Sequence, residues 1–158
     1  MNAQALKDML RRQPFAQGLR EDEIESLGRL ARLVRHESGH LIFREGQESA
    51  DFYLIVSGRV ALEIVPPTGA FCLDTLGPGE EFGWSSVLGQ KTVFQASVLQ
   101  DLEALAFDVA ELRALCEKDP AFGYRFMRRL LGVVSDRLQV TRLHLMDSYW
   151  PVARRAGA

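Results

Sequence analysis

Gly39-His-Leu-Ile-Phe-Arg-Glu-Gly46 opens the part of the chain that decides its fold, and two further stretches continue it: Asp51-Phe-Tyr-Leu-Ile-Val-Ser-Gly-Arg-Val-Ala-Leu62 and Leu76-Gly-Pro-Gly-Glu-Glu-Phe-Gly83. Each combines a short apolar run with glycine where the chain reverses. Glycine reaches positive φ without steric cost, so this spacing predicts tight turns between short strands. Several short strands separated by such turns favour an antiparallel roll, of the jelly-roll type, over a parallel sheet.

Apolar residues recur at helical spacing on both sides of this β zone. In the N-terminal part they are Leu6, Met9 and Leu10, followed by Ile24, Leu27, Ala31 and Val34. After the β zone, Asp108 with Glu111 and Asp119 with Pro120 are typical of helix starts. The sequence therefore predicts an α+β domain, ordered as N-terminal helices (1–36), a β-roll (37–107), C-terminal helices (108–147) and a short tail (148–158).

The helix expected after Asp119, ending near Met146, carries two apolar stripes. A heptad seam, with members three and four residues apart, comprises Tyr124, Met127, Leu131, Val134, Leu138, Thr141 and Leu145. A second stripe beside it comprises Phe126, Leu130, Val133 and Val140. One stripe is enough to pack the helix on its own domain, which leaves the other for a partner helix. The alternative is that the monomer buries both.

Composition excludes several classes of protein. The chain has 158 residues and a mass of 17.7 kDa, with 47% hydrophobic residues, which fits one domain with one core. Its net charge of −2 argues against a nucleic-acid partner, and no run approaches the ~20 apolar residues of a membrane span. The two cysteines are far apart in sequence and no secretory signal is evident, so we expect a cytoplasmic protein with reduced thiols.

Two pairs of residues suggest chemistry, but their spacing argues against it. His36 and His40 are four apart, yet Ser38-Gly39 between them predicts a turn, which would prevent the pairing that a helix gives to metal ligands. Glu80 and Glu81 are adjacent, and adjacent strand residues point to opposite faces. No His-x-His metal motif of a cupin-like jelly-roll enzyme is present. We therefore expect neither a metal site nor an enzyme.

The order and spacing of the three opening stretches resemble the cyclic-nucleotide-binding domain of the catabolite activator protein family, from about Phe15 to Asp147. The resemblance implies a phosphate-binding cassette of the form Phe-Gly-Glu-Leu, followed some ten residues later by Arg-Ser/Ala-Ala. In that family the glutamate holds the ribose hydroxyl and the arginine holds the phosphate. In this chain Trp84 stands in the place of the glutamate, and either Phe94 or Gln95 in the place of the arginine. The one cation within the cassette is Lys91.

The resemblance also implies a set of ligand-binding residues: Gly83, Trp84, Ser85, Ser86, Gln95, Ala96, Ser97, Thr141 and Arg142. Thr141 matches the family threonine that contacts the purine across the dimer interface, although a β-branched residue also suits a helical seam. Arg142 replaces the serine that usually follows. It either supplies the missing positive charge or is a solvated surface residue.

These residues predict a cyclic-nucleotide-binding-like regulatory domain with a degenerate cassette, dimeric through its long C-terminal helix, as the resemblance implies. Cyclic nucleotide should bind weakly or not at all, and no other cofactor is indicated. About a dozen residues follow Met146, too few for the DNA-binding domain that some family members carry there. Two function classes remain open: a sensor of a small-molecule ligand, and a ligand-free module that binds a protein partner. Space beside Gly83 favours the first, and a pocket filled by Trp84 the second.

Overall fold

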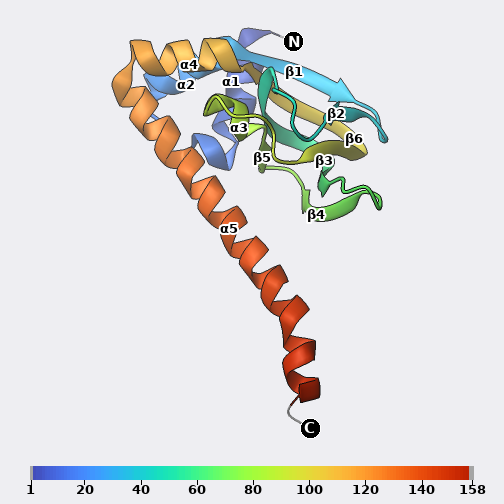
Figure 1. Ribbon diagram of the computed structural model, residues 1–158. Helices are drawn as coiled ribbons and strands as arrows, with labels where there is room; N and C mark the ends of the chain where they lie inside the picture. Colours follow the sequence, from blue (N-terminus) through green and yellow to red (C-terminus); the bar gives the residue numbers. More distant parts are fainter. Residues whose placement is uncertain (1, 157–158) are drawn as a thin grey trace. The chain divides into compact units, whose positions relative to one another are not determined.

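The computed structural model describes residues 2–156, with side chains described for residues 2–148 (Figure 1). The chain divides into two compact units, Met1–Phe126 and Met127–Ala158. The elements follow in this order: α1 Ala3–Arg11, the 3-10 helix η1 Pro14–Ala16, α2 Glu21–Leu30, β1 Ala31–His36, β2 Leu41–Phe43, β3 Asp51–Ile64, β4 Phe71–Leu76, β5 Glu81–Phe82, α3 Trp84–Val87, β6 Gln95–Asp108, α4 Val109–Lys118 and α5 Pro120–Ala156. The predicted α+β class is confirmed.

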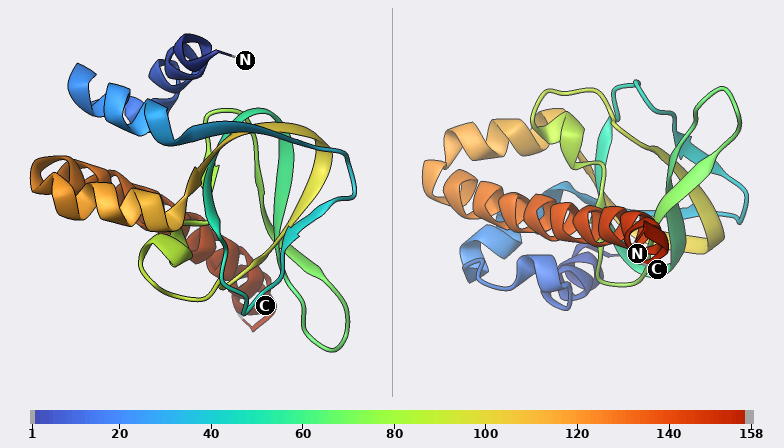
Figure 2. Two further views of the ribbon diagram at one scale, coloured as in Figure 1. Left: turned by 90° about the horizontal axis from the view of Figure 1, so that it is seen from above. Right: turned by 60° about the horizontal axis from the view of Figure 1, so that its bottom comes forward.

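Two long strands organise the sheet of the first unit. β3 and β6 each have 14 residues and pair antiparallel along most of their length. β1 and β2 pair with β6, whereas β4 and β5 pair with β3, and all of these pairings are antiparallel. Figure 2 shows that the strands curl around a common interior. Apolar side chains fill that interior, and the fully buried ones include Ile55, Val60, Leu76, Ala104 and Ala106. The antiparallel roll predicted from the turn glycines is therefore present.

A cluster of phenylalanine rings holds the N-terminal helices, the sheet and the start of α5 together within this unit. Phe15 from η1 lies with its ring centroid 5.3 Å from that of Phe52 on β3 and 5.2 Å from that of Phe126 on α5. An ion pair lies at the same junction. The Glu23 carboxylate, 3% exposed as a residue, accepts hydrogen bonds from Arg125 Nε at 3.0 and 3.1 Å. Burial and charge therefore both fix the first turns of α5 against α2.

Both predicted helix starts after the sheet are confirmed by their caps. Asp108 Oδ1 accepts a hydrogen bond from the Glu111 backbone N–H at 2.9 Å, at the start of α4. Asp119 Oδ1 accepts one from the Phe122 N–H at 3.1 Å, and Pro120 is the first residue of α5. These side chains satisfy N–H groups that have no partner inside the helix.

The N-terminal boundary of the β-roll was predicted too late in the sequence. Residues 31–36 were expected to continue the second helix, but they form β1, which pairs with β6 from Ala31 opposite Phe107 to His36 opposite Leu102. The sheet also ends one residue later than predicted, at Asp108. Pairing with a distant strand supplies backbone hydrogen bonds in place of those of a helix. Helical spacing of Ala31 and Val34 was therefore outweighed by tertiary structure.

Helix α5 is longer than predicted. It was expected to end near Met146 and to be followed by a tail over residues 148–158, but it continues to Ala156. The residues beyond Met146 include Ala153, Arg154 and Arg155, which are good helix formers, and only Pro151 opposes them. A proline inside a helix removes one backbone hydrogen bond and costs about 3 kcal/mol, which is a penalty rather than an absolute stop.

The two stripes of α5 differ in burial. Phe126 and Leu130 of the second stripe are 0% and 2% exposed, whereas Leu131 and Leu138 of the heptad seam are each 68% exposed. Leu145, farther along the seam, is 55% exposed. Which stripe meets a partner helix, and whether the monomer buries both, stays a prediction. Within the part of the chain that the structure describes, no helix combines the length and hydropathy that a bilayer span requires.

Candidate ligand-binding site

The predicted cassette begins at a sharp turn after β5. Gly83 has φ of 83°, in the left-handed region, and directly precedes the short helix α3. A Cβ placed at Gly83 would lie 2.7 Å from the backbone oxygen of Asp51, so even alanine would collide with β3 there. The turn thus needs glycine for two reasons, its φ and its close approach to the sheet. A larger residue such as valine would therefore disturb the fold together with any ligand site.

The two serines that follow have different surroundings. Ser85 and Ser86 are 5% and 6% exposed, and Ser85 lines the small pocket beside the cassette. Ser86 Oγ accepts a hydrogen bond from the Ser49 backbone N–H at 2.9 Å. This bond ties α3 to the segment just before β3. Ser86, predicted as a ligand contact, is therefore engaged in holding the cassette to the roll.

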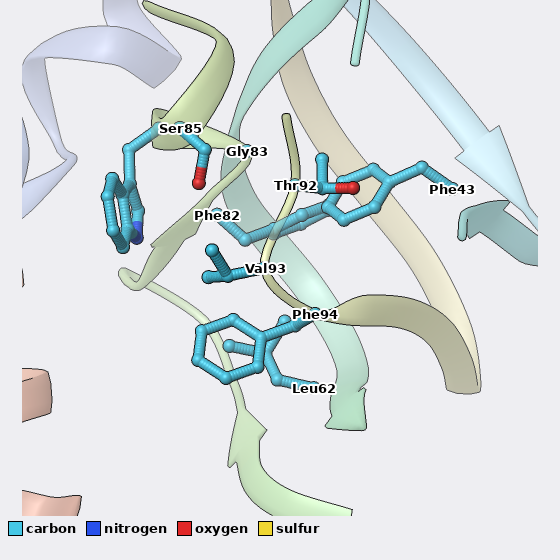
Figure 3. Close-up of a pocket in the computed structure, with 9 residues that line it drawn as sticks. Phe43, Leu62, Phe82, Gly83, Ser85, Thr92, Val93 and Phe94 are labelled. Carbon is cyan, nitrogen blue, oxygen red and sulfur yellow. The ribbon is translucent and has the colours of Figure 1, made fainter. Parts of the chain in front are cut away.

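The pocket at the cassette is almost filled by the protein's own side chains. Its volume is about 10 Å³, the space of a single water molecule. Figure 3 shows Val93 between Ser85 and Phe94, with Leu62 beside the Phe94 ring. The nine residues that line it are Phe43, Leu62, Phe82, Gly83, Trp84, Ser85, Thr92, Val93 and Phe94. Sites for small molecules usually enclose roughly 300–1,000 Å³, so this pocket has no room for a nucleotide in the described conformation.

The two candidates for the arginine's place have different surroundings. Phe94 lines the pocket, whereas Gln95 is the first residue of β6 and pairs with Glu63 of β3. Ala96, 0% exposed, belongs to the core of the sheet, and the Ser97 hydroxyl donates to the Glu63 carboxylate. The predicted contacts Gln95, Ala96 and Ser97 are therefore part of the sheet and do not line the pocket. Phe94 therefore presents a phenyl ring to the pocket, and which residue holds the arginine's place stays a prediction.

No charged side chain is among the nine described residues that line the pocket. Lys91, the cation within the cassette, is exposed and is not part of the lining. Phe82, which belongs to the lining, stacks on Tyr53 with the ring centroids 4.6 Å apart. Burial raises the pKa of Tyr53 to about 12, and the nearby Asp51 carboxylate contributes in the same direction. The floor of the pocket is therefore aromatic and neutral.

Thr92 is a residue of this site that the sequence did not reveal. It is 4% exposed, and its hydroxyl lies 2.7 Å from the Arg44 carbonyl oxygen and 2.9 Å from that of Gln47. Its backbone N–H also donates to the Gln47 carbonyl at 2.8 Å. These bonds anchor the cassette loop to the turn after β2. A single threonine in a polar loop carries no pattern that would have marked it.

Thr141 and Arg142 lie on α5 in the second unit, and both are exposed. Their contact with a ligand at the cassette stays a prediction. Gly83, Trp84 and Ser85 are the predicted residues that the structure brings together at the pocket.

The histidine pair behaves differently from expectation. The turn at Ser38-Gly39 brings the rings of His36 and His40 together, stacked with centroids 4.3 Å apart and planes 6° from parallel. Burial, followed by the neighbouring His40, lowers the pKa of His36. In stacked rings the nitrogen lone pairs run parallel and do not converge on one ion. Among the described residues, no group of three or more potential metal ligands occurs.

The fold also separates the two adjacent carboxylates, Glu80 and Glu81. Glu80 Oε2 accepts a hydrogen bond from the Gly77 backbone N–H at 2.7 Å, which closes the turn before β5. Glu81 is the first residue of β5 and pairs with Leu54 of β3. Glu80 thus has a structural partner in the turn, whereas Glu81 belongs to the sheet.

Comparison with known proteins decides the family. The family described as "Cyclic nucleotide-binding domain" matches residues 33–119, more than half of the chain. The chain belongs to the cyclic nucleotide-binding domain family. This match runs from within β1 to just past the end of α4 and includes the segment predicted as the cassette. The resemblance seen in the sequence is thereby confirmed.

Three relatives place the chain within this family. It is 29% identical over 145 residues to a CRP-like cAMP-activated global transcriptional regulator of Mycobacterium tuberculosis. The aligned region covers 90% of this chain and 62% of that protein. The solved structure of the Thermus thermophilus catabolite activator protein superposes with a TM-score of 0.69 at 29% identity, covering 84% of this chain and 62% of that one. Glutaminase 1 of Bradyrhizobium diazoefficiens is 32% identical over 133 residues, covering 83% of this chain.

The chain spans only part of these relatives. It covers 21% of the Bradyrhizobium glutaminase and 62% of the Mycobacterium regulator. The chain is thus similar to only a part of each of these proteins. The glutaminase match gives no ground for an enzymatic activity in this chain.

Proposed function

We propose that this cyclic nucleotide-binding-like domain regulates through its long helix and has lost high-affinity binding of cyclic nucleotides. The observation that carries the proposal is the neutral, filled pocket beside Gly83. A cyclic phosphate entering it would lose its hydration and meet Phe94 where a charge-assisted bond is needed. A filled pocket favours the ligand-free module over the sensor of a small molecule, the two classes that the sequence left open.

Titration calorimetry with cyclic AMP and cyclic GMP tests this proposal directly. We expect dissociation constants weaker than about 100 μM for both, because hydrogen bonds to a charged group contribute roughly 1.5–3 kcal/mol each and the described lining of the pocket offers no cation for them. A dissociation constant near or below about 1 μM would contradict the proposal. Binding that tight would mean that Lys91, Arg142 or another group supplies the positive charge for the phosphate.

Restoring the two family residues should restore binding. In the double variant Trp84→Glu/Phe94→Arg we expect the affinity for cyclic AMP to rise at least about tenfold, equivalent to about 1.4 kcal/mol, since the new guanidinium and carboxylate face the phosphate and the ribose. The matched control Trp84→Gln/Phe94→Met removes the same aromatic bulk without adding charge. If the control gains as much affinity as the charged variant, space alone limits binding and the argument from charge is wrong.

We further propose that the domain forms a homodimer through the heptad seam of α5. The seam leaves Leu131 and Leu138 each 68% exposed, although both are apolar and lie on one helical face. Pairing such a seam with a second copy removes apolar surface from water at about 25 cal/mol per Å². A regulatory signal would then pass between two copies along this helix.

Leu138→Asp should convert the dimer to a monomer, because it places a charge in the centre of the apolar seam. Light scattering coupled to size-exclusion chromatography at tens of micromolar, an estimate based on typical homodimer affinities, measures the mass. Gln139→Asp adds the same charge at an exposed neighbouring position outside the seam and should leave the dimer intact. A monomeric wild type, or equal effects of the two substitutions, would argue against the seam.

A further inference from the structure

A second hollow on the first unit is far larger than the pocket at the cassette. It lies between the N-terminal segment and one end of the roll, and its volume is about 430 Å³. Met9 and Arg12 from the end of α1, with Gln13 and Pro14, form one side of it, and Val56, Pro78 and Gly79 form the other. We call it the N-terminal groove. Its volume lies within the range of roughly 300–1,000 Å³ that small-molecule sites occupy.

The two sides of the N-terminal groove are held at a fixed, close approach. Gly79 has φ of 86°, and a Cβ placed there would lie 3.3 Å from the ring of Pro14. The Gly79 backbone N–H donates to the Ile55 carbonyl oxygen at 2.9 Å, which fixes this turn to β3. The groove is therefore built from anchored backbone on the side of the roll.

Arg12 supplies the one charge among the residues that line the groove. Its neighbour Arg11 is engaged by Asp8 and Glu21, whereas the exposed Arg12 side chain has no hydrogen bond or ion pair with any residue that the structure describes. Its guanidinium thus retains all of its donors. A planar guanidinium binds carboxylate or phosphate oxygens through two parallel hydrogen bonds.

Gln13 adds to the lining a residue with a buried polar atom that has no hydrogen-bond partner among the described residues. The residue is 7% exposed and lines the groove, yet its Oε1 atom is buried and accepts no hydrogen bond from the described part of the chain. Buried polar atoms in native proteins nearly always have a partner, and an unpartnered one is destabilising. Rotation of the terminal carboxamide exchanges its oxygen and nitrogen, so the group can meet either a donor or an acceptor.

The remaining walls are apolar. Met9, Pro14, Val56 and Pro78 present hydrocarbon surface, and methionine adapts its shape to what it contacts. We propose that the N-terminal groove binds a small amphiphilic organic anion, with its head on Arg12, a polar contact to Gln13 and an apolar body along these walls. This site is separate from the cassette and does not depend on the function proposed above.

Decanoate is a suitable probe, because it combines one carboxylate with a flexible apolar chain. We expect it to bind with a dissociation constant of roughly 10 μM to 1 mM, the range that ligands of about a dozen atoms reach. Amide chemical-shift changes in the isotope-labelled protein should map to Met9, Gln13, Val56 and Gly79. Decyl phosphate has the same apolar chain and tests whether the site binds anions in general or carboxylates alone. Binding of decanoate or of decyl phosphate supports the site. Decanol should bind at least about tenfold more weakly than decanoate, since it lacks the charge.

Two substitutions test the roles of the polar residues. Arg12→Gln should weaken decanoate binding at least about tenfold, whereas Arg113→Gln, at an exposed arginine on α4 outside the groove, should not change it. Gln13→Leu removes the unpartnered oxygen at similar volume, so it should raise the melting temperature of the ligand-free protein by roughly 2–4 °C and weaken binding.

Three results would overturn the proposal: no saturable binding of either anion, equal affinities for decanoate and decanol, or equal affinities in the Arg12→Gln and Arg113→Gln variants. Shifts confined to the apolar seam of α5 would overturn it as well, because they would show that the chain binds decanoate elsewhere. None of these results alters the expected outcome of the cyclic AMP titration.

Discussion

Gly58→Ala is expected to lower the free energy of unfolding by more than about 4 kcal/mol, a loss that few single substitutions cause. Gly58 has φ of 92°, and a Cβ placed there would lie 2.2 Å from the backbone oxygen of Asp101 on β6. The strand pairing shifts register at this point, between Ser57 and Arg59, so two backbones approach each other without room for a side chain. Urea denaturation followed by circular dichroism measures the change.

Gly39→Ala is the matched control. Gly39 has nearly the same φ, 89°, but a Cβ there would meet nothing within 4 Å. Gly39→Ala should therefore lower the free energy of unfolding only by the cost of holding alanine in the left-handed backbone conformation, about 1–2 kcal/mol. Equal losses for the two substitutions would show that the left-handed conformation alone, and not the approach of β6, makes glycine necessary at position 58.

Glu23→Ala should lower the free energy of unfolding by about 3 kcal/mol. The Glu23 side chain is 2% exposed and accepts hydrogen bonds from Arg125 and, at 2.8 Å, from the Arg20 backbone N–H. Removing one partner of a buried pair leaves the other charge uncompensated, which usually costs 3–5 kcal/mol. We expect the lower end of that range, because the Arg125 side chain is 30% exposed and water can solvate part of it.

Glu25→Ala tests whether burial is the reason. Glu25 also forms an ion pair, with Lys7 Nζ at 2.9 Å, but its side chain is 52% exposed. Exposed pairs contribute little to stability, so this substitution should have a much smaller effect in the same denaturation experiment. If both substitutions cost the same, the junction between α2 and α5 does not depend on the burial of Glu23.

Local signals in the sequence were sufficient for most of the fold. The turn glycines predicted the roll, and Asp108 and Asp119 predicted the starts of α4 and α5, because caps and tight turns depend on a few neighbouring residues. β1 was missed because the spacing of apolar residues in this segment is compatible with either a helix or a strand. What decides between the two is its partner, Leu102–Phe107, some 70 residues later in the chain.

The candidate site was predicted in part. Gly83, Trp84 and Ser85 line the pocket, and their contact with a ligand stays a prediction; Phe94, also in the lining, was one of the two positions considered for the arginine's place. The other wall residues could not be inferred, because Leu62 and Val93 reach the pocket through packing rather than through a motif. The N-terminal groove was missed entirely, since it joins residues near position 12 to a turn near position 78.

The position of β6 in the chain has a consequence for biosynthesis. Residues 95–108 supply the partner for β1, β2 and β3, so a growing chain that ends before Gln95 has synthesised all three strands without the strand that joins them. Unpaired strand edges promote association between chains. Fragments truncated before residue 95 should therefore accumulate as aggregates, and the roll can close on the ribosome only after Asp108 has left the exit tunnel.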